Sequence, residues 1–353
     1  MNRDSVALLT GPIVRVLVVD DSAYVRKVVA QMLSRSPFLE VVATARDGRE
    51  ALEAVLEHTP DVVTCDLNMP EMDGVAFVNE QMSRKPVPIL IMSVANRSGE
   101  QVLAALDAGA VDFIHKPTAL ASERLLDVAD ELIQKVKAAA NVPMPRLAAS
   151  AAHTPVPVVV DASAHRIDVI VIGISTGGPQ GLKQVIPLLP ANCPVPVLIV
   201  LHMPVGYTEL YARKLDEMSP LHVSEARHGD EVLPGRVLLA PAGRHLLLRR
   251  TGDRLHVHLD LRPLDTPHRP SVDVLFQSAA EACGARTLGV VMTGMGADGR
   301  DGCAWIKARG GRVLTEAEES CVVYGMPRSV VEAGLSDASV RIDAMARAIV
   351  ESL

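Results

Sequence analysis

The sequence has few aromatic residues, no paired cysteines, no long apolar run and no excess of basic residues. Aromatic residues make up 3% of the 353 residues and hydrophobic residues 48%, so any core must be built from aliphatic side chains and methionine. Lysine and arginine number 35 and the acidic residues 42, giving a net charge of −7. This balance argues against a nucleic-acid-binding protein, because such proteins usually carry a basic face. The length favours two domains.

The chain also lacks the segments that direct proteins into or across a membrane. No apolar run approaches the roughly 18 residues that a membrane-spanning helix needs, and no basic segment precedes an apolar one at the N-terminus. The five cysteines are scattered and never form a C-x-x-C pair, which indicates buried, reduced thiols. We therefore expect a cytoplasmic protein.

The first part of the chain, from Val14 to about Ala138, alternates short apolar runs with amphipathic stretches. Strands separated by helices predict a parallel, doubly wound α/β sheet, whose sites lie at the carboxyl ends of the strands. The predicted strands are Val14–Val19, Val41–Ala45, Val62–Cys65, Ile89–Met92 and Asp112–Ile114, and the predicted helices include Tyr24–Ser34, Arg49–Glu57 and Glu100–Ala108.

Polar side chains stand where these strands end. Asp20 and Asp21 follow the first strand and Asp66 the third, whereas Ser93 follows the fourth and Lys116 the fifth. Three carboxylates placed together repel one another unless a cation neutralises them, and Mg²⁺ prefers such oxygen ligands. Each aspartate alone could be an ordinary helix N-cap, but all five residues in this order indicate a binding site.

These residues, with the segment Met69-Pro70-Glu71-Met72-Asp73-Gly74, resemble the response-regulator receiver domain over residues 13–136. The resemblance implies a flavodoxin-like (βα)5 fold in which Asp66 is phosphorylated, so that added negative charge draws Ser93 and Lys116 inward. Asn68 departs from the family, which usually has Glu before Met-Pro. The resemblance further implies that Mg²⁺ is held by Asp20, Asp21, Asp66 and the backbone carbonyl of Asn68, that Lys116 pairs with the phosphoryl group, and that Ser93 and Phe113 are the switch residues.

A stretch rich in Ala, Pro, Ser and Val joins the two halves. Residues 137–165 have the composition of a semi-extended linker, in which Val156–Val160 could form a short strand. The second domain is expected to span residues 166–352 and to be a parallel-sheet α/β domain. It should include a β-hairpin formed by His245–Arg249 and Leu255–Leu259.

Ser175 lies in a glycine-rich turn of this second half. Residues Ile167–Ile172 predict a buried strand and Gln180–Leu189 predict a helix, with glycines on both sides of the serine. A tight turn that lifts a serine above the strand ends is typical of a nucleophile elbow. The same pattern can also cradle a phosphate at a helix N-terminus. The turn by itself leaves both functions open.

Two other residues favour the interpretation of Ser175 as a nucleophile over that of the turn as a phosphate cradle. His202 ends the apolar run Val195–Leu201, and Asp298 lies in a second glycine-rich turn after the run Leu288–Met292. A serine needs a base to take its proton, and a third group orients that base. If the three strands are neighbours, these side chains form a Ser–His–Asp triad, although Asp298 alone could be an N-cap of the following helix. The chain order Ser, His, Asp disfavours the α/β-hydrolase superfamily, which has Ser, Asp, His.

Several segments of this half resemble the CheB family of chemotaxis protein-glutamate methylesterases, over about residues 166–352. A receiver-like domain ahead of it agrees with the domain order of that family. Thr315-Glu316 departs from the family, which more often has Ala-Gln there. The matching segments are Gly173-Ile174-Ser175-Thr176-Gly177-Gly178, His202-Met203-Pro204, Ala240-Pro241-Ala242-Gly243-Arg244-His245, Arg269-Pro270-Ser271-Val272-Asp273, Thr293-Gly294-Met295-Gly296-Ala297-Asp298-Gly299 and Gly325-Met326-Pro327.

The resemblance implies a role for each site residue. Ser175 would be the nucleophile, His202 the general base and Asp298 the carboxylate that orients it. Met295 would offer its backbone N–H to the oxyanion, and Thr176 would position His202. The implied reaction is phosphorylation-activated hydrolysis of glutamyl methyl esters, and deamidation of glutamine, on chemoreceptors, without a cofactor. A histidine kinase would be the phosphodonor, nucleic acid and membrane insertion are not expected, and a monomer is expected although the oligomeric state is left open.

Two other functions fit parts of the sequence. A receiver can control a DNA-binding output, but the acidic net charge and the lack of a basic recognition helix speak against one. A nucleotide-binding module could use the Gly173–Gly178 turn as a phosphate cradle, but His202 and Asp298 would then have no role.

Overall fold

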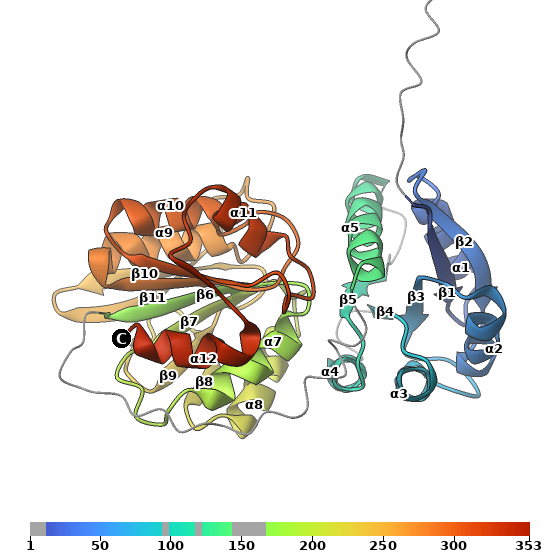
Figure 1. Cartoon of the computed structure of the whole chain (residues 1–353), viewed down its shortest axis with the longest axis horizontal. Helices are drawn as coiled ribbons and strands as arrows, with labels where there is room; N and C mark the ends of the chain where they lie inside the picture. The colour runs from blue at the N-terminus through green and yellow to red at the C-terminus, as the bar shows by residue number, and fades with distance from the viewer. Residues whose placement is uncertain (1–11, 94–98, 117–121, 143–166) are drawn as a thin grey trace, which may run out of the picture. The chain divides into compact units, whose positions relative to one another are not determined.

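The computed structural model describes residues 12–93, 99–116, 122–142 and 167–353. It contains two compact units, one built on strands β1–β5 and the other on strands β6–β14 (Figure 1). Most of the predicted linker, including Val156–Val160, lies outside the described residues. Its first residues do not form a linker, because helix α5 (Ser122–Ala140) continues through alanines and lysines that favour a helix. None of the described helices is long and apolar enough to cross a membrane.

The first unit confirms the predicted flavodoxin-like fold. Its five strands form one sheet in the order β2-β1-β3-β4-β5, with every neighbouring pair parallel. The three predicted helices are present within one residue of their predicted bounds. The elements are β1 Val14–Val19, α1 Ala23–Leu33, β2 Leu39–Ala45, α2 Gly48–His58, β3 Val62–Asp66, α3 Gly74–Arg84, β4 Ile89–Ser93, α4 Gly99–Asp107, β5 Asp112–His115 and α5.

Local capping explains where the early helices begin. Ser22, Asp47 and Asp73 each accept a hydrogen bond from a backbone N–H in the first turn of α1, α2 and α3. Gly74 opens α3 directly against the backbone of Asp66, where a Cβ would collide with the Asp66 carbonyl oxygen. The glycine therefore allows the loop after β3 to fold tightly around Asp66.

The second unit is a seven-stranded sheet in the order β14-β13-β12-β6-β7-β9-β8, again parallel throughout. Figure 1 shows α9, α10 and α11 over one face and α7, α8 and α12 over the other. A separate antiparallel pair, β10 and β11, forms the predicted hairpin. The elements are β6 Val169–Ile174, α7 Gly178–Val185, β7 Val197–Leu201, α8 Thr208–Met218, β8 His222–Glu225, β9 Arg236–Leu239, β10 His245–Thr251, β11 Arg254–Asp260, α9 Val272–Cys283, β12 Thr287–Val291, α10 Arg300–Ala308, β13 Arg312–Glu316, α11 Met326–Glu332, β14 Ala338–Val340 and α12 Ile342–Glu351.

The central strands of this sheet are covered on both faces. Every residue of β6, β7 and β12 is buried, which explains their continuous apolar sequence. The helix after Ser175 is shorter than predicted, since α7 ends at Val185 and a 3-10 turn, Ile186–Leu188, replaces the rest of Gln180–Leu189. Pro187 causes this change, because it lacks the N–H that an α-helix would need there.

Candidate active site

Three neighbouring strands bring the predicted triad segments together. In the order β12-β6-β7, Ile174 of β6 pairs with Leu201 of β7, so Ser175 and His202 leave the sheet side by side. The backbone N–H of His202 donates to the carbonyl of Ile174 at 3.1 Å. On the other side of β6, the N–H of Ser175 donates to the carbonyl of Thr293 at 3.0 Å. The Ser175 turn is thus held between the segments that carry His202 and Asp298.

The turn at Ser175 depends on glycine at two positions. Gly177 has a φ of +78°, and a Cβ there would lie 2.6 Å from the side chain of Val322. A Cβ on Gly294 would lie 2.8 Å from the Cβ of Ser175, so the facing loop also needs glycine to approach the serine. Ser175 is half-buried, and its hydroxyl has no hydrogen-bond partner among the described residues. This hydroxyl is available to a substrate.

The imidazole of His202 lies against Asp298. Its Nε2 is 2.8 Å from Oδ2 of Asp298, and the two side chains are 9% and 8% exposed. The other ring nitrogen, Nδ1, is buried and has no hydrogen-bond partner in the part of the chain that the structure describes. A carboxylate on Nε2 keeps the proton there, so Nδ1 presents the lone pair of a base.

Asp298 is held as a carboxylate by the start of helix α9. Its oxygens accept hydrogen bonds from the backbone N–H groups of Val272 (2.8 Å) and Asp273 (3.0 Å) and from the hydroxyl of Ser271 (2.8 Å). Burial alone would raise the pKa of Asp298, but the hydrogen bond and charge of His202 and these two amides hold it well below its usual range. The interpretation of Asp298 as an N-cap of the following helix is wrong, since it caps α9 and not α10.

Helix α10 takes its cap from Asp273 instead. Oδ1 of Asp273 accepts hydrogen bonds from the backbone N–H groups of Gly299 (2.9 Å) and Gly302 (2.7 Å), so α9 and α10 exchange capping carboxylates. Burial, with the neighbouring charge of Asp298, raises the pKa of Asp273 to about 6. The sequence pattern marked the segment Arg269–Asp273 but did not identify this role, because a cap is normally sought within its own helix.

Replacing Asp273 by asparagine tests this exchange. An acid whose pKa is raised by folding stabilises the protein most at low pH, and that contribution is lost as the pH rises through the folded value of about 6. Asparagine keeps an oxygen for both amides without the charge. We therefore expect the melting temperature of Asp273→Asn, relative to the wild type, to increase between about pH 4 and pH 7. Asp273→Ala, which also removes the acceptor oxygens, should be about 0.5–2 kcal/mol less stable than Asp273→Asn at every pH in this range, and equal stability of the two variants would contradict the exchange.

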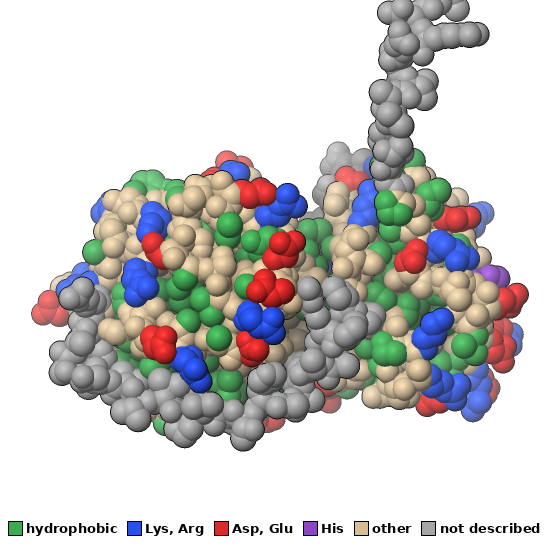
Figure 2. Space-filling view, viewed as in Figure 1, with side chains coloured by type: hydrophobic (Ala, Val, Ile, Leu, Met, Phe, Trp, Pro, Cys, Tyr) green, Lys and Arg blue, Asp and Glu red, His purple; other side chains and the backbone are tan. Residues whose placement is uncertain are grey.

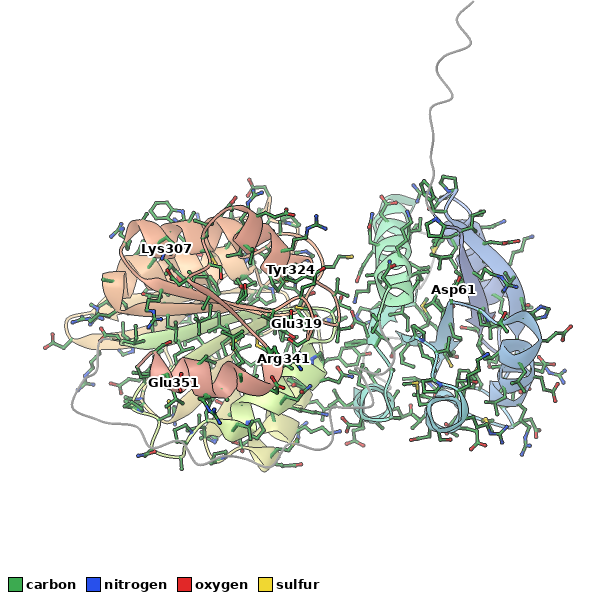
Figure 3. The ribbon with its side chains drawn as sticks, in the orientation of Figure 1. Asp61, Lys307, Glu319, Tyr324, Arg341 and Glu351 are labelled. Atoms are coloured by element: carbon green, nitrogen blue, oxygen red, sulfur yellow. The ribbon has the colours of Figure 1, made fainter. Side chains whose placement is uncertain are left out.

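The segment Gly294–Met295 faces Ser175 from the other side. Its backbone is fixed by hydrogen bonds from the N–H of Gly294 to Val323 (3.0 Å) and from the N–H of Met326 to Gly294 (2.8 Å). Gly294 also pairs with Tyr324, which Figure 3 shows in the connection between β13 and α11. The N–H of Met295 has no acceptor among the described residues. It has the properties of an oxyanion donor.

Three further residues complete the surroundings. Thr176 is buried, and its carbonyl accepts the Thr293 hydroxyl at 3.0 Å. His245 is fully buried, accepts the N–H of Ser271 at 3.2 Å, and has a pKa lowered chiefly by burial, so it supports the loop before α9. The exposed ring of His268 stacks on His202 with centroids 4.1 Å apart, a contact for which the sequence contained no signal.

The predicted polar cluster is present in the first unit. Nζ of Lys116 lies 2.7 Å from an oxygen of Asp20 and 2.7 Å from an oxygen of Asp66, and carboxylate oxygens of Asp20, Asp21 and Asp66 lie within 4.8 Å of one another. Burial raises the pKa of Asp66, helped by the charge of Asp20 and opposed by Lys116. Burial would lower the pKa of Lys116, but hydrogen bonds to the two aspartates raise it.

The remaining receiver residues lie near this cluster in the fold. Ser93 ends β4, and its carbonyl accepts the N–H of Lys116 at 2.8 Å. Phe113 lies in β5 and is buried, as is Ser93. Asn68 follows β3 in the loop after Asp66 and is exposed. Strands β3, β4 and β5 are neighbours, so their carboxyl ends meet at one edge as predicted.

Comparison with known proteins agrees with both units. The model of the CheB methylesterase family matches residues 170–349, and that of the response regulator receiver domain matches residues 16–130. A protein of Myxococcus xanthus named protein-glutamate methylesterase/protein-glutamine glutaminase 5 is 49% identical over 333 residues, which cover 94% of this chain and 96% of that protein. A Halalkalibacterium halodurans protein named protein-glutamate methylesterase/protein-glutamine glutaminase is 43% identical over 338 residues, covering 96% of this chain and 97% of that protein.

A solved structure is similar to the second unit alone. The crystal structure of the CheB methylesterase catalytic domain of Thermotoga maritima matches with a TM-score of 0.52 and 41% identity, covering 53% of this chain and 99% of that chain. The family match and the near full-length relatives agree with the domain order found here. The chain belongs to the CheB methylesterase family and carries a response regulator receiver domain ahead of its esterase domain.

Proposed function

We propose that this chain hydrolyses glutamyl methyl esters and deamidates glutamine on the cytoplasmic part of chemoreceptors, using Ser175, His202 and Asp298. The observation that carries the proposal is the pair formed by His202 and Asp298, 2.8 Å apart, at the strand end beside Ser175. The near full-length relatives named methylesterase/glutaminase support the same reaction. The phosphate-cradle function offers no role for a buried histidine–carboxylate pair.

The hydrogen bond between His202 and Asp298 supports the following proton movements. Nδ1 of His202 takes the Ser175 hydroxyl proton as the serine oxygen attacks the ester carbonyl, and Asp298 stabilises the imidazolium through Nε2. The N–H of Met295 donates to the oxyanion of the tetrahedral intermediate. Collapse releases methanol, which takes the proton from His202, and leaves an acyl-enzyme. Water then attacks the acyl carbonyl with His202 as base, releasing the glutamate side chain.

Deamidation follows the same steps with a different leaving group. Attack of Ser175 on a glutamine carboxamide gives the same acyl-enzyme, and the proton held by His202 goes to the departing ammonia. Both reactions need only the triad and the oxyanion donor, so the esterase chemistry requires no cofactor. Thr176, buried beside the nucleophile, would position His202.

The first domain is proposed to be the switch, with Asp66 the phosphorylated residue. Its cluster of three carboxylates fits a hard divalent cation, because one lysine cannot balance three negative charges. Asp20, Asp21, Asp66 and the carbonyl of Asn68 would hold Mg²⁺, which when bound offsets the negative charge of an incoming phosphoryl group. Lys116 would pair with the phosphoryl oxygens, and Ser93 and Phe113 would respond to them.

The partners and domain limits complete the proposal. A chemotaxis histidine kinase would supply the phosphoryl group, the methylated receptor would be the substrate, and the protein would work in the cytoplasm as a monomer. The domains would span residues 13–136 and 166–352, joined by residues 137–165, of which the first four belong to α5. Figure 2 shows acidic and basic side chains interspersed on the visible face of the second unit, which does not resemble the one-sign surface of a DNA-binding output.

The experiment that tests the function is methanol release from a methylated receptor fragment, with and without a small-molecule phosphodonor and Mg²⁺. Release that increases with the phosphodonor supports both domains' proposed roles. A protein that bound nucleotides or DNA but released no methanol would contradict them.

Replacing Asp66 by asparagine separates the switch from the catalyst. A carboxamide cannot accept a phosphoryl group, so we expect Asp66→Asn to keep the basal rate of methanol release and to lose activation by the phosphodonor. Asp130→Asn, at an exposed position of α5, is the matched control and should retain activation. Activation of Asp66→Asn to the wild-type level would assign phosphorylation to another residue.

A further inference from the structure

Glu316 is a buried carboxyl group directly behind the active site. It ends strand β13, is 0% exposed, and has no basic side chain among the described residues as a partner. One carboxyl oxygen accepts the backbone N–H of Thr293 at 2.9 Å, and the other lies 3.0 Å from the hydroxyl of Ser320. An ionised carboxylate is rarely buried without a cation, so its surroundings call for the neutral acid.

The hydrogen bonds around Ser320 accommodate a protonated Glu316. The Ser320 hydroxyl lies 3.2 Å from the carbonyl of Ala317, to which it can donate, and it accepts the N–H of Ile342 at 3.0 Å. Its remaining acceptor site faces Glu316, so a carboxylic O–H can donate to it while the other oxygen accepts from Thr293. Every polar group of this network is then satisfied. Burial raises the pKa of Glu316 to about 7, although the Thr293 N–H, the Ser320 hydroxyl and the Cys321 thiol would each lower it by donating to the ionised carboxylate.

Thr293 connects Glu316 to the reacting groups. Its N–H binds Glu316, its carbonyl accepts the N–H of Ser175 at 3.0 Å, and its hydroxyl donates to the carbonyl of Thr176 at 3.0 Å. The next two residues of the chain are Gly294 and Met295, whose N–H is the proposed oxyanion donor. One residue thus holds the nucleophile turn and begins the oxyanion loop, and the Glu316 side chain holds that residue.

The charged groups around this network lie apart from Glu316. Among the described residues, the buried Cys321 of the same connection hydrogen-bonds Glu316 through its thiol, but it supplies no positive charge. Glu318 and Glu319 are exposed, and Arg341 of the connection to α12 pairs with Asp343; Figure 3 labels Glu319 and Arg341. None of them neutralises an ionised Glu316, so loss of its proton places an unpaired anion behind the oxyanion loop.

We propose that Glu316 is a positioning residue that acts in its protonated form, holding Thr293 so that the Ser175 turn and the Met295 N–H stay aligned, and that ionisation of Glu316 lowers turnover. The proposal rests on the esterase function proposed above. An anion behind the loop opposes the negative charge that develops on the substrate oxygen, and it removes the O–H that donates to Ser320. The site therefore combines a catalytic triad with a neutral acid that titrates close to physiological pH.

The test compares Glu316→Gln with the wild type across pH. Glutamine accepts from Thr293 and donates to Ser320 as the protonated acid does, but it cannot ionise. With phosphodonor present, kcat of the wild type should fall above about pH 7, whereas Glu316→Gln should keep a flat alkaline limb and exceed the wild type about tenfold at pH 8 if the ionised form is inactive. Glu319→Gln, exposed three residues away, should follow the wild type.

Thermal unfolding supplies a readout that does not depend on esterase activity. Folding raises the pKa of Glu316, so its contribution to stability is complete at low pH and is lost as the pH rises through about 7. The melting temperature of Glu316→Gln minus that of the wild type should therefore increase from pH 5 to pH 9. The proposal would be overturned if kcat of Glu316→Gln and of the wild type changed with pH in the same way and their melting temperatures differed by the same amount at every pH. Absence of methanol release at every pH, with the melting difference still pH-dependent, would instead refute the esterase function and the positioning role resting on it.

Discussion

Ser175→Ala is expected to abolish methanol release while leaving the fold and its stability unchanged. The Ser175 hydroxyl makes no hydrogen bond with a described residue, so its removal leaves no buried group unsatisfied. Loss of a triad nucleophile typically lowers kcat by about 10⁶-fold, and what remains comes from binding and the oxyanion donor. The measurement is single-turnover methanol release with phosphodonor, accompanied by a thermal melt.

A matched control is Ser352→Ala, at the C-terminal end of helix α12, where the hydroxyl donates only to the carbonyl of Ala348. It should retain wild-type turnover. Near-normal turnover of Ser175→Ala, with a normal melt, would show that another group attacks the ester. Loss of activity together with a lowered melting temperature would instead assign the serine a structural role.

Asp298→Asn is expected to lower both activity and stability, in contrast to Ser175→Ala. Asparagine can turn an amide N–H toward Nε2 of His202, which moves the ring proton to Nδ1 and removes the lone pair that Nδ1 would use as a base. A wrong tautomer of this kind lowers kcat by about 10⁴-fold. Stability falls because the negative charge at the start of α9, bound by Val272 and Asp273, is lost.

The pH dependence of this loss has a definite sign. The pKa of Asp298 is depressed in the folded protein, so its stabilising contribution is present above the unfolded pKa and is lost as the pH falls toward the folded value. The melting difference between the wild type and Asp298→Asn should be largest near pH 7 and shrink below about pH 4. Asp301→Asn, exposed on α10, is the control and should melt as the wild type does. A pH-independent difference would contradict the role of the charge.

Much of the fold could be predicted because its signals are local. Buried parallel strands are continuous apolar runs, and those that end at Asp20, Asp66 and His202 were recognisable for that reason. Helix ends were less accurate where a single residue intervenes, as Pro187 does after α7. The extension of α5 to Ala140 was missed because alanine is common in both linkers and helices.

The residues of the candidate site could be predicted from their local sequence, but their contacts with distant segments could not. Asp298 was found because it follows an apolar run in a glycine-rich segment, but its donors on α9 are 25 and 26 residues away in the chain. The stacking of His268 on His202 and the exchange of caps with Asp273 join segments that no periodicity relates. Contacts of this kind depend on how distant segments pack together, and no short stretch of the sequence indicates that packing.

The sequence by itself determined the α/β class, the two halves and the candidate residues of the site, since hydrophobic period and turn composition are properties of short segments. Only the tertiary structure decided where those residues lie relative to one another and how they are charged. The order β12-β6-β7 places Ser175 between the segments of His202 and Asp298, and the start of α9 keeps Asp298 ionised. Complete burial, with no basic partner among the described residues, raises the pKa of Glu316 to about 7. The pKa of an acidic residue depends on surroundings that distant segments create. Asp298 and Glu316 therefore have pKa values shifted in opposite directions, although both belong to the second unit.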